Sequence, residues 1–203
     1  VREGVKPGSE YHMTEYFGPI LGIMTADTLE EAIELQNAPD YGLTAGLHSL
    51  DADDLELWLS KVQAGNVYVN RGITGAIVRR QPFGGWKKST VGSGTKAGGP
   101  NYLVALTDWE PDHATATTVP QSVAVREVLA TAEGASLCGA KDFEFIKRSA
   151  SSDAHAWETE FGYGHDPSKL GVERNILRYL PTQVLVRADE SAPAAEVVRV
   201  VLA

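Results

Sequence analysis

Glycine is unusually dense between residues 65 and 100, and this stretch is the part of the chain best suited to hold a ligand. It begins as a short apolar strand, 66–70, and continues without helical or alternating periodicity. Irregular loops of this length are uncommon inside a compact domain unless they bind something. Glycine permits positive φ and lets backbone amides approach a ligand closely. It occupies positions 72, 75, 84, 85, 92, 94, 98 and 99, which predicts a ligand-binding loop at the end of a strand.

A second group of residues has the chemistry of a hydroxyl-binding site. Glu15 and Phe17 precede a turn at Gly18-Pro19. A carboxylate suits two neighbouring hydroxyls, because each of its oxygens can accept a hydrogen bond from one of them. By composition alone, however, a polar residue beside an aromatic one before a turn is most often the entrance of a strand. These residues therefore do not identify a ligand by themselves.

Several motifs, in the same order along the chain, resemble the aldehyde dehydrogenase superfamily. Pro-Phe-Gly-Gly after a short apolar strand, found here at 82–85, is general in that superfamily, as is Glu-x-Phe-Gly-Pro, found at 15–19. Thr-Gly-Ala at 74–76 and the run KAGGPNY at 96–102 resemble a narrower family, the 1-pyrroline-5-carboxylate (L-glutamate γ-semialdehyde) dehydrogenases. These enzymes occur alone or as a module of bifunctional proline-utilisation flavoenzymes. The resemblance implies a C-terminal fragment of such an enzyme.

The resemblance assigns roles to both groups of residues. Glu15 would bind both hydroxyls of the nicotinamide ribose of NAD, and Phe17 would pack near the nicotinamide ring. The loop after residue 74 would anchor the amino-acid end of glutamate semialdehyde through backbone N–H groups. Gly75, Ala76 and Phe83 match the contacting positions, although Ala76 lacks the hydroxyl that some relatives have there. FAD would belong to an upstream proline dehydrogenase module outside this sequence.

Two arginines in the same loop could also bind a carboxylate. Arg79 and Arg80 are adjacent, and adjacent residues of an extended chain point to opposite sides. At most one of them is therefore expected to face the site, and a solvated surface is favoured for both.

The residues that perform the chemical step are not expected in this chain. In the family, a cysteine thiolate upstream of Glu-x-Phe-Gly-Pro attacks the aldehyde, hydride passes to NAD, and water hydrolyses the resulting thioester. The one cysteine here, Cys138, lies far downstream and is expected to be a small buried apolar residue. The five histidines show no metal-binding spacing. We therefore predict no catalytic residue, no metal site and no turnover by the chain alone.

The elements that must position these residues follow an α/β pattern. A capping box at Thr28 and Glu31 predicts one helix, and Asp51 predicts the start of a second, with Gly65 placed as a C′ residue after its end. Strands are expected within 19–26, 41–50 and 66–70. The alternation of strands and helices favours parallel crossovers. Open sheets of this class bind ligands beyond the carboxyl ends of their strands, where the loop begins.

Three regions are expected along the chain. Residues 1–109 would form the C-terminal part of an aldehyde dehydrogenase catalytic domain, an open and mostly parallel sheet with flanking helices. Its last strand, 102–109, would pair with a neighbouring subunit. A polar linker at 110–120 would lead to a smaller α/β region, 121–203, which resembles a degenerate aldehyde dehydrogenase cofactor domain. In that region helices are expected at 125–134, 143–161 and 192–203, and a strand at 183–187.

Composition limits the classes of partner. A net charge of −9 over 203 residues argues against nucleic acid, and no apolar run reaches membrane-spanning length. A small-molecule substrate, a homo-oligomer and a cytoplasmic location are expected. Two alternatives stay open. One is a non-catalytic scaffold or oligomerisation module, and the other is an aldehyde dehydrogenase for a different substrate.

Overall fold

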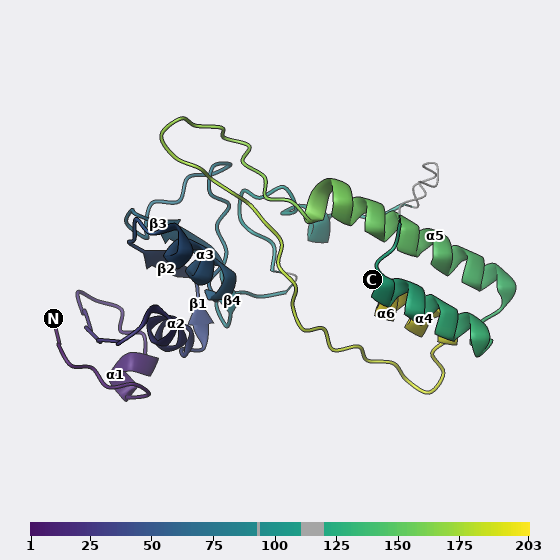
Figure 1. The fold of residues 1–203 in the computed structure, drawn as a ribbon, viewed down its shortest axis with the longest axis horizontal. Helices are drawn as coiled ribbons and strands as arrows, with labels where there is room; N and C mark the ends of the chain where they lie inside the picture. Colours follow the sequence, from purple (N-terminus) through teal and green to yellow (C-terminus); the bar gives the residue numbers. More distant parts are fainter. Residues whose placement is uncertain (93, 111–119) are drawn as a thin grey trace. The chain divides into compact units, whose positions relative to one another are not determined.

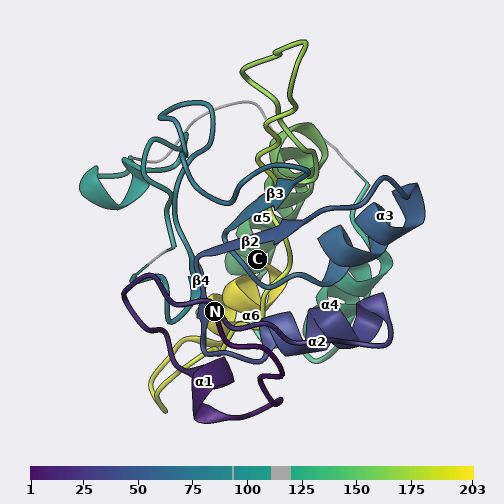
Figure 2. The ribbon, with the colours of Figure 1, turned by 90° about the vertical axis from the view of Figure 1, so that its left-hand side faces the viewer.

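Figures 1 and 2 show the protein as a computed structural model, which describes residues 1–92, 94–110 and 120–203. The chain forms two compact units. Unit 1 comprises Val1–Asp108 together with Pro167–Asn175, and unit 2 comprises Trp109–Asp166 together with Ile176–Ala203. The expected linker at 110–120 falls almost wholly on residues 111–119, which lie outside the described part. The expected domain boundaries therefore stay a prediction.

Unit 1 is built around one β-α-β crossover. Strand β2 (Thr44–Leu47) is followed by helix α3 (Ala52–Lys61) and strand β3 (Asn66–Val69). The two strands are parallel and in register from Thr44 opposite Asn66 to Leu47 opposite Val69. This confirms the expected α/β class and the parallel crossover. The second strand ends where the glycine-rich loop starts, as the sequence predicted.

Helix α2 (Leu29–Asn37) and helix α3 pack together and share one apolar cluster with β2 (Figure 2). Its centre is Trp58, which is only 2% exposed and whose indole N–H donates to Gln36 Oε1 at 2.8 Å. The helix starts are as predicted. Thr28 Oγ1 accepts from the Glu31 N–H at 3.2 Å, and Asp51 Oδ1 accepts from the Asp53 N–H at 2.8 Å. These caps satisfy N–H groups that have no partner within the helix.

Two smaller elements complete unit 1. Strand β1 (Tyr41–Gly42) pairs antiparallel with β4 (Trp86–Lys87), which brings the far end of the loop back beside the crossover. A short helix, α1 (Glu10–Met13), lies near the start of the chain. The strand expected within 19–26 is wrong, because these residues form only a single bridge, from Gly22 to Arg2.

Two other predicted strands are also wrong. The predicted subunit-contact strand, 102–109, instead contains a 3₁₀ helix, η1 (Val104–Leu106), in which Leu106 N–H bonds back to Leu103 O at 2.9 Å. Residues 183–187 form no strand, and Val184 and Leu185 are largely exposed. Both segments are apolar enough for a strand, but a strand needs a partner for its N–H and C=O groups. In 102–109 local turn bonds take that place.

The described elements of unit 2 are helical. Helices α4 (Val123–Gly134), α5 (Ala140–Ala156) and α6 (Ala194–Leu202) contact one another, and α5 continues into a π-helical turn, η2 (Trp157–Phe161). All three predicted helices are therefore confirmed. Their core comprises Leu129, Ala132, Phe143, Ile146, Ala150, Val198 and Leu202. Cys138 is half-buried and packs against this core, as expected of a small apolar residue. Residues 165 and 177 add one antiparallel bridge.

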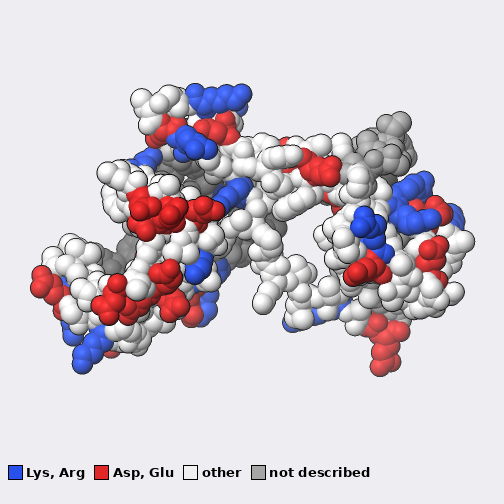
Figure 3. Space-filling view, in the orientation of Figure 1, with Lys and Arg blue, Asp and Glu red and all other residues white. Residues whose placement is uncertain are grey.

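Acidic side chains gather over α2 and α3 (Figure 3). Helix α2 carries three glutamates and no basic residue, and α3 carries Asp53, Asp54 and Glu56 against one lysine. This face would repel phosphate groups, in keeping with the charge argument made from composition. In the part of the chain that the structure describes, no helix combines the length and apolarity needed to cross a bilayer.

Candidate functional site

The loop that leaves β3 takes backbone conformations that only a few residue types tolerate. Asn70, at the strand end, has φ +56°, Gly75 has φ +81° and Arg79 has φ +64°. Arg79 is the third residue of a turn closed by the Arg80 N–H to Ile77 O bond at 3.0 Å. A positive φ at that position is typical of a type II turn. Arg79 is exposed there, as expected.

Two neighbouring amides in this loop are available to a ligand. Within the described residues, the N–H groups of Gly75 and Ala76 donate no hydrogen bond. Two bonds fix the loop on either side of them: the Ile77 N–H donates to Gln81 Oε1 at 3.0 Å, and the Thr74 carbonyl accepts from Arg71 at 3.3 Å. Consecutive backbone N–H groups of this kind form a concavity suited to an anion. The loop is therefore fixed at Thr74 and Ile77, and the N–H groups of Gly75 and Ala76 between them can donate to a ligand.

Phe83 is fixed differently, since its backbone is already paired. Its N–H donates to Ala97 O at 3.0 Å and its carbonyl accepts from the Ala97 N–H at 2.8 Å. Asn66 holds both neighbours of Phe83, because its Nδ2 donates to Pro82 O at 3.0 Å and its Oδ1 accepts from the Gly84 N–H at 3.1 Å. The Phe83 N–H is thus unavailable to a ligand. What remains is its ring, since the residue is 38% exposed.

A half-buried lysine, Lys96, connects two backbone segments beside Asn66 and Phe83. Lys96 Nζ donates to Gly65 O at 2.7 Å and to Gly84 O, and lies 3.4 Å from Asn66 Oδ1. Burial lowers the pKa of Lys96 to about 8, while the three oxygen acceptors surround its ammonium group. Lys96 therefore joins the segment before β3 to the Pro-Phe-Gly-Gly turn. Its position in KAGGPNY suggested the family but not this role.

Gly65 serves the same junction rather than a helix end. Helix α3 already ends at Lys61, so the predicted C′ role of Gly65 is wrong. A Cβ at Gly65 would lie 1.9 Å from Gly84 O and 2.6 Å from Gly85 Cα. Glycine is required there because two backbone segments approach each other too closely for any side chain.

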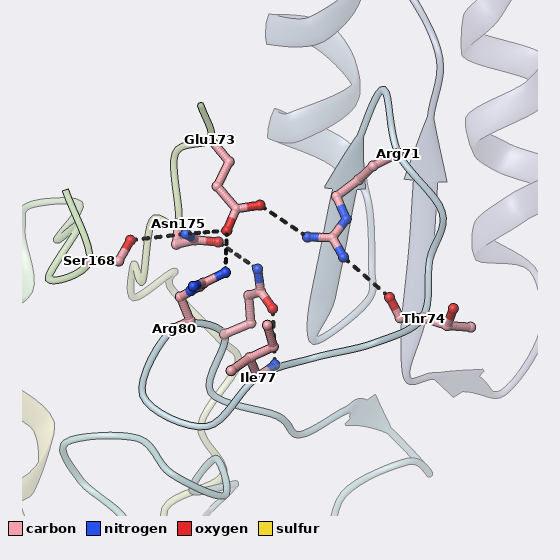
Figure 4. Close-up of polar contacts among 8 residues, drawn as sticks. Arg71, Thr74, Ile77, Arg80, Ser168, Glu173 and Asn175 are labelled. Carbon is pink, nitrogen blue, oxygen red and sulfur yellow. Dashed lines mark hydrogen bonds and ion pairs between the residues drawn. The ribbon is translucent and has the colours of Figure 1, made fainter. Parts of the chain in front are cut away.

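The flanks of the loop are tied to a distant segment of unit 1, residues 167–175 (Figure 4). Glu173 lies between two arginines, with Oε2 3.4 Å from Arg71 Nη1 and Oε1 3.3 Å from Arg80 Nη1. Gln81 Nε2 donates to Asn175 Oδ1 at 2.7 Å. Arg80 is therefore paired with Glu173 and only partly exposed, which corrects the expectation of a fully solvated side chain.

Glu15 and Phe17 lie outside this network. Both are exposed, Phe17 completely so, and the Glu15 carboxylate makes no hydrogen bond or ion pair with any described residue. Among the residues that the structure describes, there is no polar or ring contact between these two residues and the loop. The two groups of predicted site residues are thus positioned separately, and each presents unused ligand-binding groups.

Comparison with known proteins identifies the family of this chain. Residues 1–110 match the Aldehyde dehydrogenase family, and this range is more than half of the 203 residues. The chain belongs to the aldehyde dehydrogenase family. The residues discussed above in β3, the loop and the Pro-Phe-Gly-Gly turn all fall within the matched range.

Curated relatives match the aldehyde dehydrogenase part of this chain. It is 42% identical over 100 residues to a 1-pyrroline-5-carboxylate dehydrogenase from Geobacillus sp. (strain WCH70), covering 49% of this chain and 19% of that protein. It is 41% identical over 111 residues to the bifunctional protein PutA of Rhizobium meliloti, covering 52% of this chain and 9% of that protein. The chain thus spans a fifth or less of these relatives.

One solved structure resembles nearly the whole chain. Proline utilization A (PutA) from Corynebacterium freiburgense matches with a TM-score of 0.83 and 48% identity over 98% of this chain and 19% of that one. This likeness extends beyond the range of the family match, into residues 111–203. It confirms that the α/β fold expected for the aldehyde dehydrogenase region is the right one.

Proposed function

We propose that this chain forms part of an enzyme that oxidises L-glutamate γ-semialdehyde to L-glutamate with NAD in proline catabolism. The family match and the names of the relatives support this reaction. Within that enzyme the chain would supply the substrate anchor and part of the cofactor site. The nucleophile would come from another part of the protein, because Cys138 is half-buried and packs against the core of unit 2.

The observation that carries the proposal is the pair of unused amides at Gly75 and Ala76. The substrate ends in a carboxylate, and two adjacent N–H groups can donate to its two oxygens. Because neighbouring groups of the loop are already paired, the amides are held ready before the substrate arrives. Pre-organised donors bind more tightly than donors that must be ordered on binding. The Phe83 ring would form an apolar wall beside the carbon chain.

The residues expected to bind NAD fit that cofactor. Glu15 presents a carboxylate without a partner among the described residues, and Phe17 presents a fully exposed ring. A carboxylate can accept from both hydroxyls of a ribose, and an aromatic ring can stack beside a flat heterocycle. NAD would accept the hydride from the substrate. Glu15 and Phe17 would hold and orient its nicotinamide riboside.

Three further features belong to this proposed enzyme. We include in the proposal a homo-oligomer, a flavin-containing proline dehydrogenase module elsewhere in the polypeptide, and a C-terminal region, 121–203, derived from a cofactor domain. The similarity to a bifunctional protein named PutA supports a second enzymatic module elsewhere in the polypeptide.

Replacement of Glu15 by glutamine tests the cofactor role in the full-length protein. Glutamine keeps one acceptor oxygen but removes the charge, and a hydrogen bond to a charged group is worth about 1.5–3 kcal/mol. We expect KM for NAD to rise about tenfold or more with little change in KM for the aldehyde. Steady-state kinetics with NAD varied is the measurement. Glu3→Gln, another exposed glutamate nearby, is the control, and an equal KM in all three proteins would contradict the role.

A further inference from the structure

Glu173 is the centre of a charged cluster that the sequence does not suggest. Its carboxylate bridges Arg71 and Arg80, with one oxygen near each guanidinium. The Glu173 side chain is 27% exposed, and those of Arg71 and Arg80 are 37% and 39% exposed. Glu173 lies 102 positions from Arg71 and 93 positions from Arg80 along the chain. Such a cluster forms only if the segment 167–175 returns to the loop.

The two arginines lie at the two ends of the substrate-anchor loop. Arg71 follows β3 directly, lies 5.1 Å from the ring centre of Tyr68 in that strand, and donates to Thr74 O. Tyr68 is buried, so this end of the loop is attached to the rigid part of unit 1. Arg80 lies at the other end, immediately before Gln81. Glu173 therefore links the two ends of the loop.

A second set of contacts supports the same connection. Gln81 accepts from the Ile77 N–H inside the loop and donates to Asn175 outside it. Asn175 Nδ2 in turn donates to Ser168 Oγ at 2.9 Å and to Glu173 Oε1 at 3.2 Å. Figure 4 shows these side chains converging from the loop and from the returning segment. Neither set of contacts uses the N–H groups of Gly75 and Ala76.

We propose that Glu173 is a positioning residue for substrate binding. By holding Arg71 and Arg80, it keeps the loop in the one conformation that presents the Gly75 and Ala76 amides together. This inference rests on the proposed function, because it assigns Glu173 a part in anchoring that substrate. Without the two ion pairs of Glu173, substrate binding itself must order the loop. The free-energy cost of that ordering weakens binding. The chemical step, which takes place at the aldehyde, is not affected.

Removal of the charge of Glu173 also tests whether Arg71 and Arg80 bind the substrate carboxylate themselves. If they bound the substrate carboxylate themselves, Glu173 would compete with it, and its removal would strengthen binding. If Glu173 positions the loop, its removal weakens binding. The two roles predict opposite changes in KM, so one variant separates them.

The test is Glu173→Gln in the full-length protein, assayed with L-glutamate γ-semialdehyde and with pentanal. Pentanal has the same number of carbons but no amino-acid end, so it does not use the anchor amides. Partly exposed ion pairs are weak individually, and we expect the two together to raise KM for the semialdehyde about five- to tenfold. We expect kcat to change less than twofold and the kinetics with pentanal to stay the same. Glu190→Gln, an exposed glutamate of unit 2, is the matched control.

Hydrogen exchange of residues 72–81 in the same proteins gives a readout that does not depend on activity. We expect faster exchange in Glu173→Gln and partial recovery in Glu173→Asp. An unchanged or lowered KM for the semialdehyde in Glu173→Gln would overturn the positioning role, as would an equal rise in KM for pentanal. Failure of the wild-type protein to oxidise the semialdehyde would instead overturn the proposed function, so the two failures are distinguishable.

Discussion

Ala76→Pro is expected to lower kcat/KM for L-glutamate γ-semialdehyde about tenfold to a hundredfold. Proline has no N–H, so the variant removes one of the two amides that are free to bind the substrate carboxylate. A hydrogen bond to a charged group contributes about 1.5–3 kcal/mol, which corresponds to this range of binding constants. The measurement is steady-state kinetics of the full-length protein with the semialdehyde and with pentanal. Only the semialdehyde should be affected.

Val78→Pro is the control for this variant. Val78 is the second residue of the turn between Ile77 and Arg80, and proline is favoured at that position of a type II turn. It lies two residues from Ala76 and makes no backbone N–H bond within the described residues. We therefore expect near wild-type kinetics. An equal loss with both substrates in Ala76→Pro, or no loss with either, would contradict the role of the Ala76 amide.

Gly65→Ala is expected to destabilise unit 1 by about 3 kcal/mol or more. The added Cβ would overlap backbone atoms of Gly84 and Gly85, and backbone cannot move aside as a flexible side chain can. Any shift would also disturb the bond from Lys96 Nζ to Gly84 O and the bond from the Gly84 N–H to Asn66 Oδ1. The measurement is the free energy of unfolding in urea, with a probe in unit 1.

Gly72→Ala is the matched control, because an added Cβ there meets nothing within 4 Å and the backbone needs no positive φ. Alanine at such a position is neutral or stabilises slightly through the unfolded state. A Gly65→Ala protein as stable as Gly72→Ala would show that the loop does not pack against residue 65 as described.

Local patterns predicted the parts of the fold that depend on local interactions. The caps at Thr28 and Asp51 act within one helical turn, and the strand 66–70 is followed at once by its loop. The segments 102–109 and 183–187 have strand-forming composition, but a strand depends on a partner that composition does not specify. Gly65 was assigned to the nearest helix, whereas its neighbours in space are almost twenty residues away.

In the candidate site, too, local motifs indicated some residues, whereas others depend on partners distant in sequence. Glu15, Phe17, Gly75, Ala76 and Phe83 were chosen by their motifs, and their roles stay predictions. The residues that hold the loop were missed, because Asn66, Lys96 and Glu173 act through partners distant in sequence. A buried asparagine at the start of a strand was the one available signal, since such a side chain needs hydrogen-bond partners.

The most direct test of the central claim is the substrate preference of the full-length wild-type protein. With NAD in excess, kcat/KM is measured for L-glutamate γ-semialdehyde and for pentanal, and the product of the first reaction is identified by mass spectrometry. If the loop anchors the amino-acid end, the semialdehyde should be preferred about a hundredfold or more and the product should be glutamate. Equal values for the two aldehydes would contradict the claim.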